Sequence, residues 1–309
     1  MGEKSLLALL TELGTPSVDS GGEPGSGKRP AIMLVAFEGW NDAGSAASDA
    51  VALLERELGA EAIATIGEDD YYDYQFSRPS VRRTSAGQRV IQWPTTRVLR
   101  AARPDRGHDL LLVRGVEPTY RWKAFCAELL TLAEAQNVQA VVLTGALLAD
   151  SPHTRPVPLS VTSDDATVRE GLGADAPGYE GPTGIVGVLA AVAEAAGLPT
   201  VSVWAAVPHY VAQSPSPKAT YALLRRLEDL LEIEVDLHLL GEDAEAWERG
   251  VDELAGEDPE IAAYVKQLEE AQDAAELPEA SGESIAREFE RYLKRREDGR
   301  GDGGRPPRP

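Results

Sequence analysis

Short runs of apolar residues, each about as long as a β-strand, recur along the chain with helical patterns between them. Residues 31–37 are apolar without a break, which is typical of a strand buried on both faces. Apolar residues at helical spacing within 44–58 and a second apolar run over 62–66 follow, so this part predicts a βαβ unit. Similar strand-like runs lie at 110–113, 140–143, 159–161 and 201–204. We therefore predict an α/β fold, with a mostly parallel sheet covered by helices on both faces.

One segment departs from this alternation. Residues 89–93 are rich in residues that favour strands, and Ser85-Ala-Gly87 before them supplies turn residues. We predict an antiparallel excursion within 71–99, so that the sheet is mixed.

Composition divides the chain into parts. Residues 15–30 consist largely of Gly, Ser, Pro and charged residues, which bury too little apolar area to offset the entropy of ordering. We expect a flexible N-terminal segment over 1–30 and the α/β domain over 31–240. Within the domain we expect an amphipathic helix over 218–231 and a last strand over 234–239.

Acidic residues concentrate after this domain. Residues 242–298 hold 19 acidic and 7 basic residues, which is −12 of the net charge of −21. Apolar residues still recur there at helical spacing. We predict an acidic three-helix extension over 241–298 and a disordered tail over 299–309. The three apolar stripes are Trp247, Val251 and Leu254; Ile261, Val265 and Leu268; and Ile285, Phe289 and Tyr292.

The net charge and the single cysteine exclude several classes of protein. Binding to nucleic acid needs clustered Lys and Arg that neutralise phosphates, and anionic membranes are disfavoured for the same reason. Cys126 is the only cysteine, so one chain can form neither a disulfide framework nor a zinc site built on cysteines. No apolar stretch approaches the roughly 18 residues of a membrane helix. We expect a cytoplasmic protein with no nucleic-acid or membrane partner.

The turn after the first strand is one candidate site. Glu38-Gly-Trp-Asn-Asp-Ala-Gly44 lies where open α/β sheets place ligands. Its spacing fits neither a dinucleotide fingerprint nor a P-loop, and Glu38 and Asp42 would repel a phosphate. The alternative is a structural turn in which Asn41 or Asp42 caps the following helix. We expect no cofactor at this turn.

Carboxylates and tyrosines follow the second predicted parallel strand. Asp70, Tyr72 and Asp73 are expected at the same sheet edge as Glu38. Paired carboxylates can perform acid–base chemistry or hold a cation, but nearby arginines, Arg78 among them, can neutralise them as a surface rim. Tyrosine is enriched where proteins meet. These residues are therefore candidates for contact with a ligand or partner, and we expect no metal.

Three glycines, Gly181, Gly184 and Gly187, are expected on one helix at a spacing of three. Each costs about 1 kcal/mol of helix propensity relative to Ala, so close packing must compensate. The packing surface is either the sheet of the same chain or a neighbouring subunit. Pro182 and Thr183 suit the first turn of that helix.

The four histidines, His108, His153, His209 and His238, are scattered, and none has a partner at metal-ligand spacing. No G-x-S-x-G motif supports a hydrolase triad. His153 and His209 lie in proline-rich loops and are the only plausible general bases. We expect neither to act as one, and we assign no catalytic residue.

Taken together, four motifs resemble the proteasome-assembly-chaperone-2-like family, and within it the actinobacterial branch with an acidic helical extension. They are Phe37-Glu-Gly-Trp-Asn-Asp-Ala-Gly44, the stretch from Asp70-Tyr-Tyr-Asp-Tyr74 to Arg78-Pro79, Arg114-Gly-Val-Glu-Pro118, and Glu180-Gly-Pro-Thr-Gly-Ile185. The resemblance implies a phosphorylase/hydrolase-like α/β fold and homo-oligomers, with a trimer as the expected form. Some archaeal members dock on the proteasome through a hydrophobic-tyrosine C-terminal motif, which the final residues 305–309 lack.

Two functions follow from the motifs and the resemblance. The first is a non-enzymatic homo-oligomeric scaffold or assembly chaperone, with itself and proteasome subunits or another protein as partners. The second is an enzyme or small-ligand sensor with a cleft formed by Glu38, Asn41, Asp42 and Thr183. The missing phosphate-binding chemistry disfavours the second.

Overall fold

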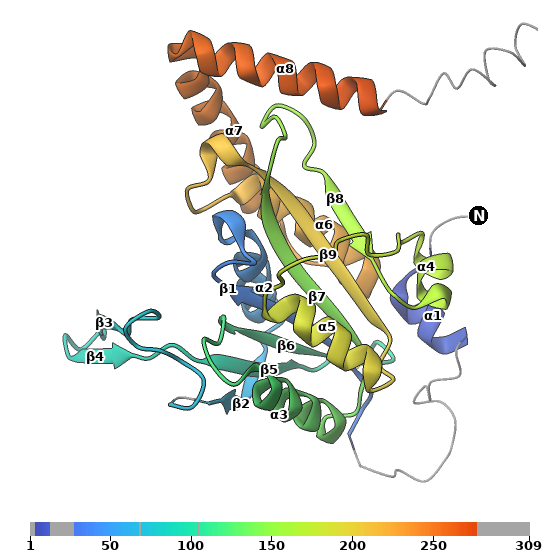
Figure 1. The fold of residues 1–309 in the computed structure, drawn as a ribbon. Coiled ribbons are helices and arrows are strands. Elements are labelled where there is room, and N and C mark those ends of the chain that lie inside the picture. The colour runs from blue at the N-terminus through green and yellow to red at the C-terminus, as the bar shows by residue number, and fades with distance from the viewer. Residues whose placement is uncertain (1–3, 13–27, 68, 104, 277–309) are drawn as a thin grey trace, which may run out of the picture.

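The structure is a computed structural model and describes residues 4–12, 28–67, 69–103 and 105–276. Its centre is a seven-stranded mixed sheet with the strand order β2-β5-β6-β1-β7-β9-β8 (Figure 1). The strands are β1 (Ala31–Glu38), β2 (Glu61–Ile66), β5 (Thr96–Ala101), β6 (Asp109–Val116), β7 (Val138–Ala149), β8 (Leu159–Thr162) and β9 (Thr200–Pro208).

The four central strands, β6, β1, β7 and β9, are parallel. β1 is buried along all but its last residue, because the sheet has helices on both sides. Its side chains alternate between two cores: Leu34 faces one and Val35 the other. An uninterrupted apolar run therefore fills both layers with alternate residues.

Helices cover both faces (Figure 1). One core joins the sheet to α2 (Ala46–Glu57), α6 (Pro217–Leu231), α1 (Leu6–Glu12) and α4 (Ala166–Leu172). The other joins it to α3 (Trp122–Ala135) and α5 (Ile185–Ala195). The expected fold class, a mostly parallel mixed sheet with helices on both faces and further helices at the C-terminal end, is confirmed.

The predicted βαβ unit is wrong in its strand pairing. β2 runs in the direction of β1, but β5 and β6 lie between them. β2 is an edge strand on which only Ile66 is buried, whereas residues 110–113 of β6 are all buried and take the place beside β1. Burial, rather than order along the chain, decides which strand lies at the centre.

The antiparallel excursion contains a β-hairpin. β3 (Ser80–Arg83) pairs with β4 (Arg89–Gln92) in a sheet of its own, which projects from the body of the protein (Figure 1). Its turn includes Gly87 at a φ of +80°, a conformation that suits glycine.

The N-terminal segment differs from the expectation of flexibility over 1–30. Leu6–Glu12 form α1, which lies beside α4 (Figure 1). Leu6, Leu9 and Leu10 are buried in the first core. The Gly-, Ser- and Pro-rich composition begins only at residue 15, and the leucines before it form a buried apolar stripe.

The C-terminal part begins earlier than expected and contains no strand over 234–239. Asp236 Oδ1 accepts a hydrogen bond of 3.0 Å from the His238 N–H, and α7 (His238–Glu257) starts there. α8 (Pro259–Glu276) follows. The predicted third helix and the tail over 299–309 lie outside the described residues.

We predict that Leu9→Ala lowers the free energy of unfolding by about 2–5 kcal/mol, the usual cost of a large-to-small change in a core. Leu9 is 3% exposed and packs on Gly171 of α4. Chemical denaturation followed by circular dichroism measures the change. Thr11→Ala, at an exposed position of the same helix, is the control and should change stability little. If Leu9→Ala lowered the free energy of unfolding as little as Thr11→Ala, α1 would not be part of the cooperative fold.

Candidate functional site

The turn after β1 buries Asn41 and Asp42 but leaves Gly39 and Trp40 exposed. Gly39 has a φ of +118°, which an L side chain rarely adopts. Asn41 and Asp42 are 3% and 7% exposed, whereas Trp40 between Gly39 and Asn41 is 70% exposed. The Ala146 N–H donates to the Asn41 carbonyl at 2.9 Å, which holds the turn on β7.

Asp42 caps α2 from within the protein. Its Oδ1 accepts a hydrogen bond of 2.7 Å from the Ala47 N–H, and its Oδ2 lies 3.3 Å from the Ser48 N. Burial raises the pKa of Asp42 above its usual 3.8 and outweighs the hydrogen bonds that lower it. The structural alternative from the sequence, a helix cap, is the role that the geometry gives this residue.

Glu117 is the central residue of this edge, and the sequence analysis missed it. Its Oε1 accepts two hydrogen bonds of 2.9 Å, from Asn41 Nδ2 and from the backbone N–H of Ile185. A carboxylate from the loop after β6 therefore occupies the N-terminus of α5, a favourable place for negative charge. The feature of the sequence that points to Glu117 is its position directly after β6, the strand beside β1.

Gly184 is glycine because Asn41 leaves no room for a side chain. A Cβ at Gly184 would clash with the Asn41 amide, and Gly184 is the residue before α5 rather than part of it. Gly181 lies in the preceding loop beside Tyr179, and Gly187 faces the Thr183 hydroxyl. The expected stripe on one helix is therefore wrong. The subunit interface proposed for these glycines stays a prediction.

The second group of sequence candidates packs against the loop after β6, which carries Glu117: the Tyr72 hydroxyl donates to the Val116 carbonyl at 3.3 Å. Asp70 pairs with Arg121 at 2.9 Å, not with the arginines near Arg78. Tyr72 is buried and its hydroxyl lies 2.8 Å from Thr96 Oγ1; burial raises its pKa to about 12. Tyr72 thus supports the loop after β2 from inside the fold, whereas the pair of Asp70 with Arg121 is exposed.

Asp73 and Glu38 lie nearer to solvent. Asp73 accepts a hydrogen bond of 2.7 Å from the exposed Tyr120, which lowers the pKa of Asp73. Glu38 is about half exposed and lies 3.5 Å from Arg114. Thr183 is exposed as well. No ion pair or hydrogen bond joins the carboxylates of Glu38 and Asp73 in the described part of the chain.

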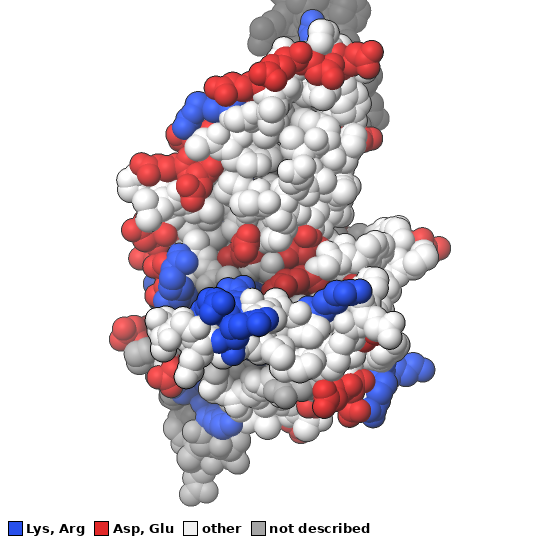
Figure 2. All heavy atoms as spheres, turned by 90° about the vertical axis from the view of Figure 1, so that its left-hand side faces the viewer, with Lys and Arg blue, Asp and Glu red and all other residues white. Residues whose placement is uncertain are grey.

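Apolar side chains remain exposed around the turn after β1. We call Trp40, Leu147, Leu148 and Tyr179 the apolar rim; they are 70%, 47%, 50% and 70% exposed. Leu147 and Leu148 end β7, and the Tyr179 hydroxyl donates to the Pro182 carbonyl at 2.9 Å, just before α5. Figure 2 shows the side of the molecule to which the hairpin projects, with a broad uncharged surface below the acidic side chains at the top and with acidic and basic side chains next to each other lower down.

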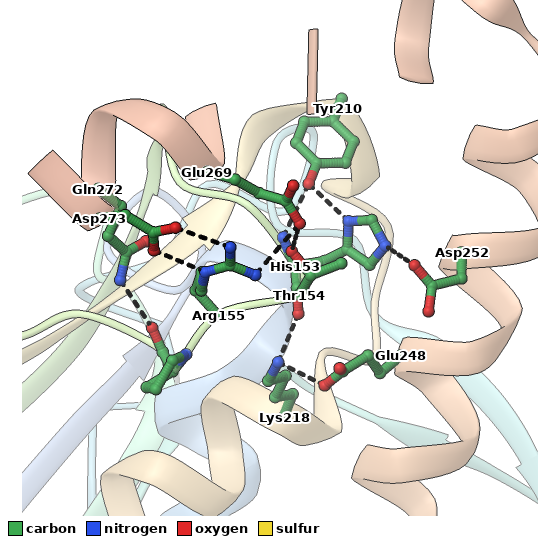
Figure 3. Close-up of polar contacts among 11 residues, drawn as sticks. His153, Thr154, Arg155, Tyr210, Lys218, Glu248, Asp252, Glu269, Gln272 and Asp273 are labelled. Atoms are coloured by element: carbon green, nitrogen blue, oxygen red, sulfur yellow. Dashed lines mark hydrogen bonds and ion pairs between the residues drawn. The ribbon is translucent and has the colours of Figure 1, made fainter. Parts of the chain in front are cut away.

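A second polar cluster attaches α7 and α8 to the α/β domain (Figure 3). The buried His153 ring contacts the Tyr210 hydroxyl through Nδ1 at 2.7 Å and Asp252 of α7 through Nε2 at 3.0 Å. Arg155 reaches Asp273 of α8 at 2.7 and 2.9 Å. Both ring nitrogens of His153 thus contact structural partners, and burial raises the pKa of Tyr210 to about 12. The arrangement is that of an anchor for the helices.

Two further histidines, His209 and His108, also have structural surroundings, whereas His238 is exposed. His209 lies 3.1 Å from Asp150 and packs against two tyrosines. His108 is buried beside Arg103, and burial lowers its pKa to about 4. In the residues that the structure describes, no group of three or more His, Cys, Asp or Glu could hold a metal ion. None of the described helices has the length and apolar character that a membrane crossing requires.

These features define a class of α/β proteins: a mixed sheet whose carboxyl edge is closed by the chain's own carboxylates, with an acidic pair of helices anchored beside it. A model of the PAC2 family matches residues 36–255. The chain belongs to the PAC2 family.

Two solved structures are similar over nearly their whole length. A PAC2 family protein from Streptomyces avermitilis is 52% identical with a TM-score of 0.71, covering 76% of this chain and 99% of that chain. A proteasome-assembly chaperone homologue from Mycobacterium tuberculosis is 49% identical with a TM-score of 0.68, at the same coverage of 76% and 99%. The resemblance inferred from the four sequence motifs is confirmed at the level of the family.

A more distant structure shares the fold. An archaeal proteasome activator from Pyrococcus furiosus is 16% identical with a TM-score of 0.57, covering 75% of this chain and 96% of that chain. No curated protein matches the chain.

We predict that Asp42→Ala lowers the free energy of unfolding by about 1–2 kcal/mol, because the first turn of α2 loses its cap. Asp42→Asn retains an acceptor and should stay close to the wild type at neutral pH. The raised pKa means that the folded state binds the Asp42 proton more tightly than the unfolded state. The wild type should therefore lose stability relative to Asp42→Asn as the pH rises from 3.8 through the raised value. Denaturation at several pH values measures this; a gain over that range would contradict it.

Proposed function

We propose that this protein is a non-enzymatic, homo-oligomeric scaffold or assembly chaperone, and that proteasome subunits are among the proteins it binds. One observation carries the proposal: the chain's own carboxylates occupy the helix N-termini at the carboxyl edge of the sheet, while large apolar side chains around that edge face solvent. The edge is suited to contact with a protein rather than to binding a small anion.

The electrostatics of the edge disfavour the alternative, an enzyme or small-ligand sensor. A site that binds phosphate or an oxyanion needs free N–H groups or cations. The N–H groups of Ala47 and Ile185 already donate to Asp42 and Glu117. An incoming anion would have to displace a carboxylate of the protein and would meet its charge.

The apolar rim supports the choice of a protein partner. Trp and Tyr are enriched in protein interfaces because they bury a large apolar area with a polar tip. Trp40 and Tyr179 are each 70% exposed, and both belong to segments fixed by hydrogen bonds. Such rigid aromatic side chains lose little entropy on binding.

Proteasome subunits are the proposed clients because of the relatives. The Mycobacterium tuberculosis relative is described as a proteasome-assembly chaperone homologue, and its 49% identity over 76% of this chain makes a related role the natural proposal. A closed trimer, a location in the cytoplasm and an actinobacterial origin are further parts of this proposal, as is self-association through helix α5, which carries no charge before Glu194.

We predict that Trp40→Ala weakens binding to purified proteasome core subunits at least about tenfold, as loss of a buried aromatic anchor does. Binding is measured by biolayer interferometry with separate α and β subunits, and native mass spectrometry reports the complexes formed. Leu239→Ala is the control, because Leu239 is 74% exposed but lies on α7. Equal affinities of the two variants would contradict a role of the rim, and no binding by the wild type would contradict the proteasome proposal.

We also predict that phosphate and nucleotides do not stabilise the protein beyond the effect of a neutral salt. The reason is that Asp42 and Glu117 already occupy the helix N-termini. Differential scanning fluorimetry with phosphate, nucleoside and nucleotide, against sodium chloride at equal ionic strength, measures the melting temperature. A saturable shift with any of these ligands, together with phosphorolysis of a nucleoside, would favour the enzyme alternative.

A further inference from the structure

The hairpin is exposed on both faces. We call residues 76–93 the basic hairpin. All eight residues of β3 and β4 are exposed, and a two-stranded hairpin is at best marginally stable in water on its own. Trp93 at its base packs on Tyr74 with 4.8 Å between ring centroids. The base is thus fixed, and the projecting part has no cover within the described residues.

The basic hairpin combines apolar side chains with unpaired positive charge. Val81 and Ile91 are directly opposite each other and 55% and 57% exposed. Arg83 lies opposite Arg89 on the same face, and like charges in such a pair are unfavourable. Phe76 beside the strands is 82% exposed.

The charge of the basic hairpin contrasts with the rest of the protein. It contains four arginines, Arg78, Arg82, Arg83 and Arg89, and no acidic residue, in a chain of net charge −21. None of the four forms an ion pair with another described residue; Arg83 donates to the Gly87 carbonyl at 3.2 Å. A partner for this surface must therefore bring carboxylates and apolar side chains.

The junction of α7 and α8 offers that combination. We define the acidic corner by two exposed apolar residues and the four carboxylates around them. Leu254 is 65% exposed and Ile261 is 37% exposed. The carboxylates are those of Glu253, Glu257, Asp258 and Glu260, which are exposed and form no ion pair with described residues. Four carboxylates and two aliphatic side chains thus face solvent together.

We propose that the basic hairpin of one molecule docks on the acidic corner of a second copy of this chain. Within one molecule the two surfaces lie apart, with the hairpin at the lower left and the α7–α8 junction at the upper left of Figure 1. In Figure 2 acidic side chains line the top of the face, and the basic ones lie lower down with further acidic ones next to them. Charge complementarity of this kind fixes the orientation of partners and speeds association.

Two copies do not pair hairpin against hairpin. Such a symmetric contact would place arginines of both molecules together, and like charges at an interface oppose association. The docking is therefore heterologous, with different surfaces on the two partners, and repetition closes a ring when the rotation allows it. This inference rests on the proposed homo-oligomeric scaffold and places its contacts on the basic hairpin and the acidic corner, in place of α5.

Charge reversal on each surface tests the proposal. The hairpin variant carries Arg82→Glu and Arg89→Glu, and the corner variant carries Glu253→Lys and Glu257→Lys. All four positions are exposed, so both variants should fold, which circular dichroism and thermal melting check. Each variant alone should show a dissociation constant of self-association raised at least about tenfold in sedimentation equilibrium.

Mixing the two variants is the decisive measurement. In an equimolar mixture the reversed hairpin meets the reversed corner, and the unchanged hairpin meets the unchanged corner, so unlike copies should associate again. A closed ring of three keeps one mismatched contact, so the measured quantity is the dissociation constant of the pair of unlike copies. The matched controls are Arg56→Glu with Lys123→Glu and Glu134→Lys with Glu170→Lys, which change the net charge equally at exposed positions of α2, α3 and α4. The control pairs should associate as the wild type does.

The outcomes separate this inference from the proposed function. Restored association in the mixture supports the docking. Variants that associate as well as the wild type, a mixture that stays apart, or controls that dissociate equally would overturn it. If the variants associate unchanged, the homo-oligomeric proposal stands and only the contact surfaces are wrong. If the wild type is a monomer at micromolar concentration and moderate salt, both the docking and the homo-oligomer are wrong, while binding to proteasome subunits is tested separately.

Discussion

A single carboxylate oxygen holds together the edge on which this protein's proposed role depends. Glu117 Oε1 binds the Asn41 amide and the Ile185 N–H, both at 2.9 Å. It thereby joins the turn after β1, the loop after β6 and the start of α5. A partly buried carboxylate is stable there because two donors and a helix dipole compensate for lost water. Residue 184 must therefore be glycine, because the Asn41 amide that Glu117 orients fills the space that a side chain would need.

This arrangement distinguishes the sheet edge of this protein from the ligand sites that other proteins of its fold class have there. Open α/β sheets bind anions at helix N-termini beside the carboxyl ends of their strands. Here Asp42 and Glu117 occupy two such termini. The aromatic Trp40 then points outward beside the buried Asn41 and Asp42. The same arrangement of the turn thus closes a small-molecule site and presents a surface for a protein.

The sequence predicted the sheet and its two helix layers well, but it predicted poorly which strands pair with each other. Apolar runs identified the buried strands, because a strand covered on both faces needs apolar residues throughout. They did not reveal that β2 lies at an edge, since its pairing with β5 depends on long-range contacts. Likewise, Asp42 could be predicted as a cap from local spacing, whereas Glu117 could not. Its partners Asn41 and Ile185 are 76 and 68 residues away along the chain, and no local pattern encodes that approach.

The distribution of charge sets long-range repulsion between copies against short-range attraction at the proposed contact. Copies with a net charge of −21 repel each other at long range, and salt near 0.1 M confines that repulsion to about 10 Å. The four arginines of the basic hairpin then act only where they touch carboxylates. In the proposed docking the acidic helices therefore have two effects: they keep copies apart in wrong orientations and attract the hairpin in one. Orientation by local charge within an overall repulsive field favours a defined assembly over disordered aggregation.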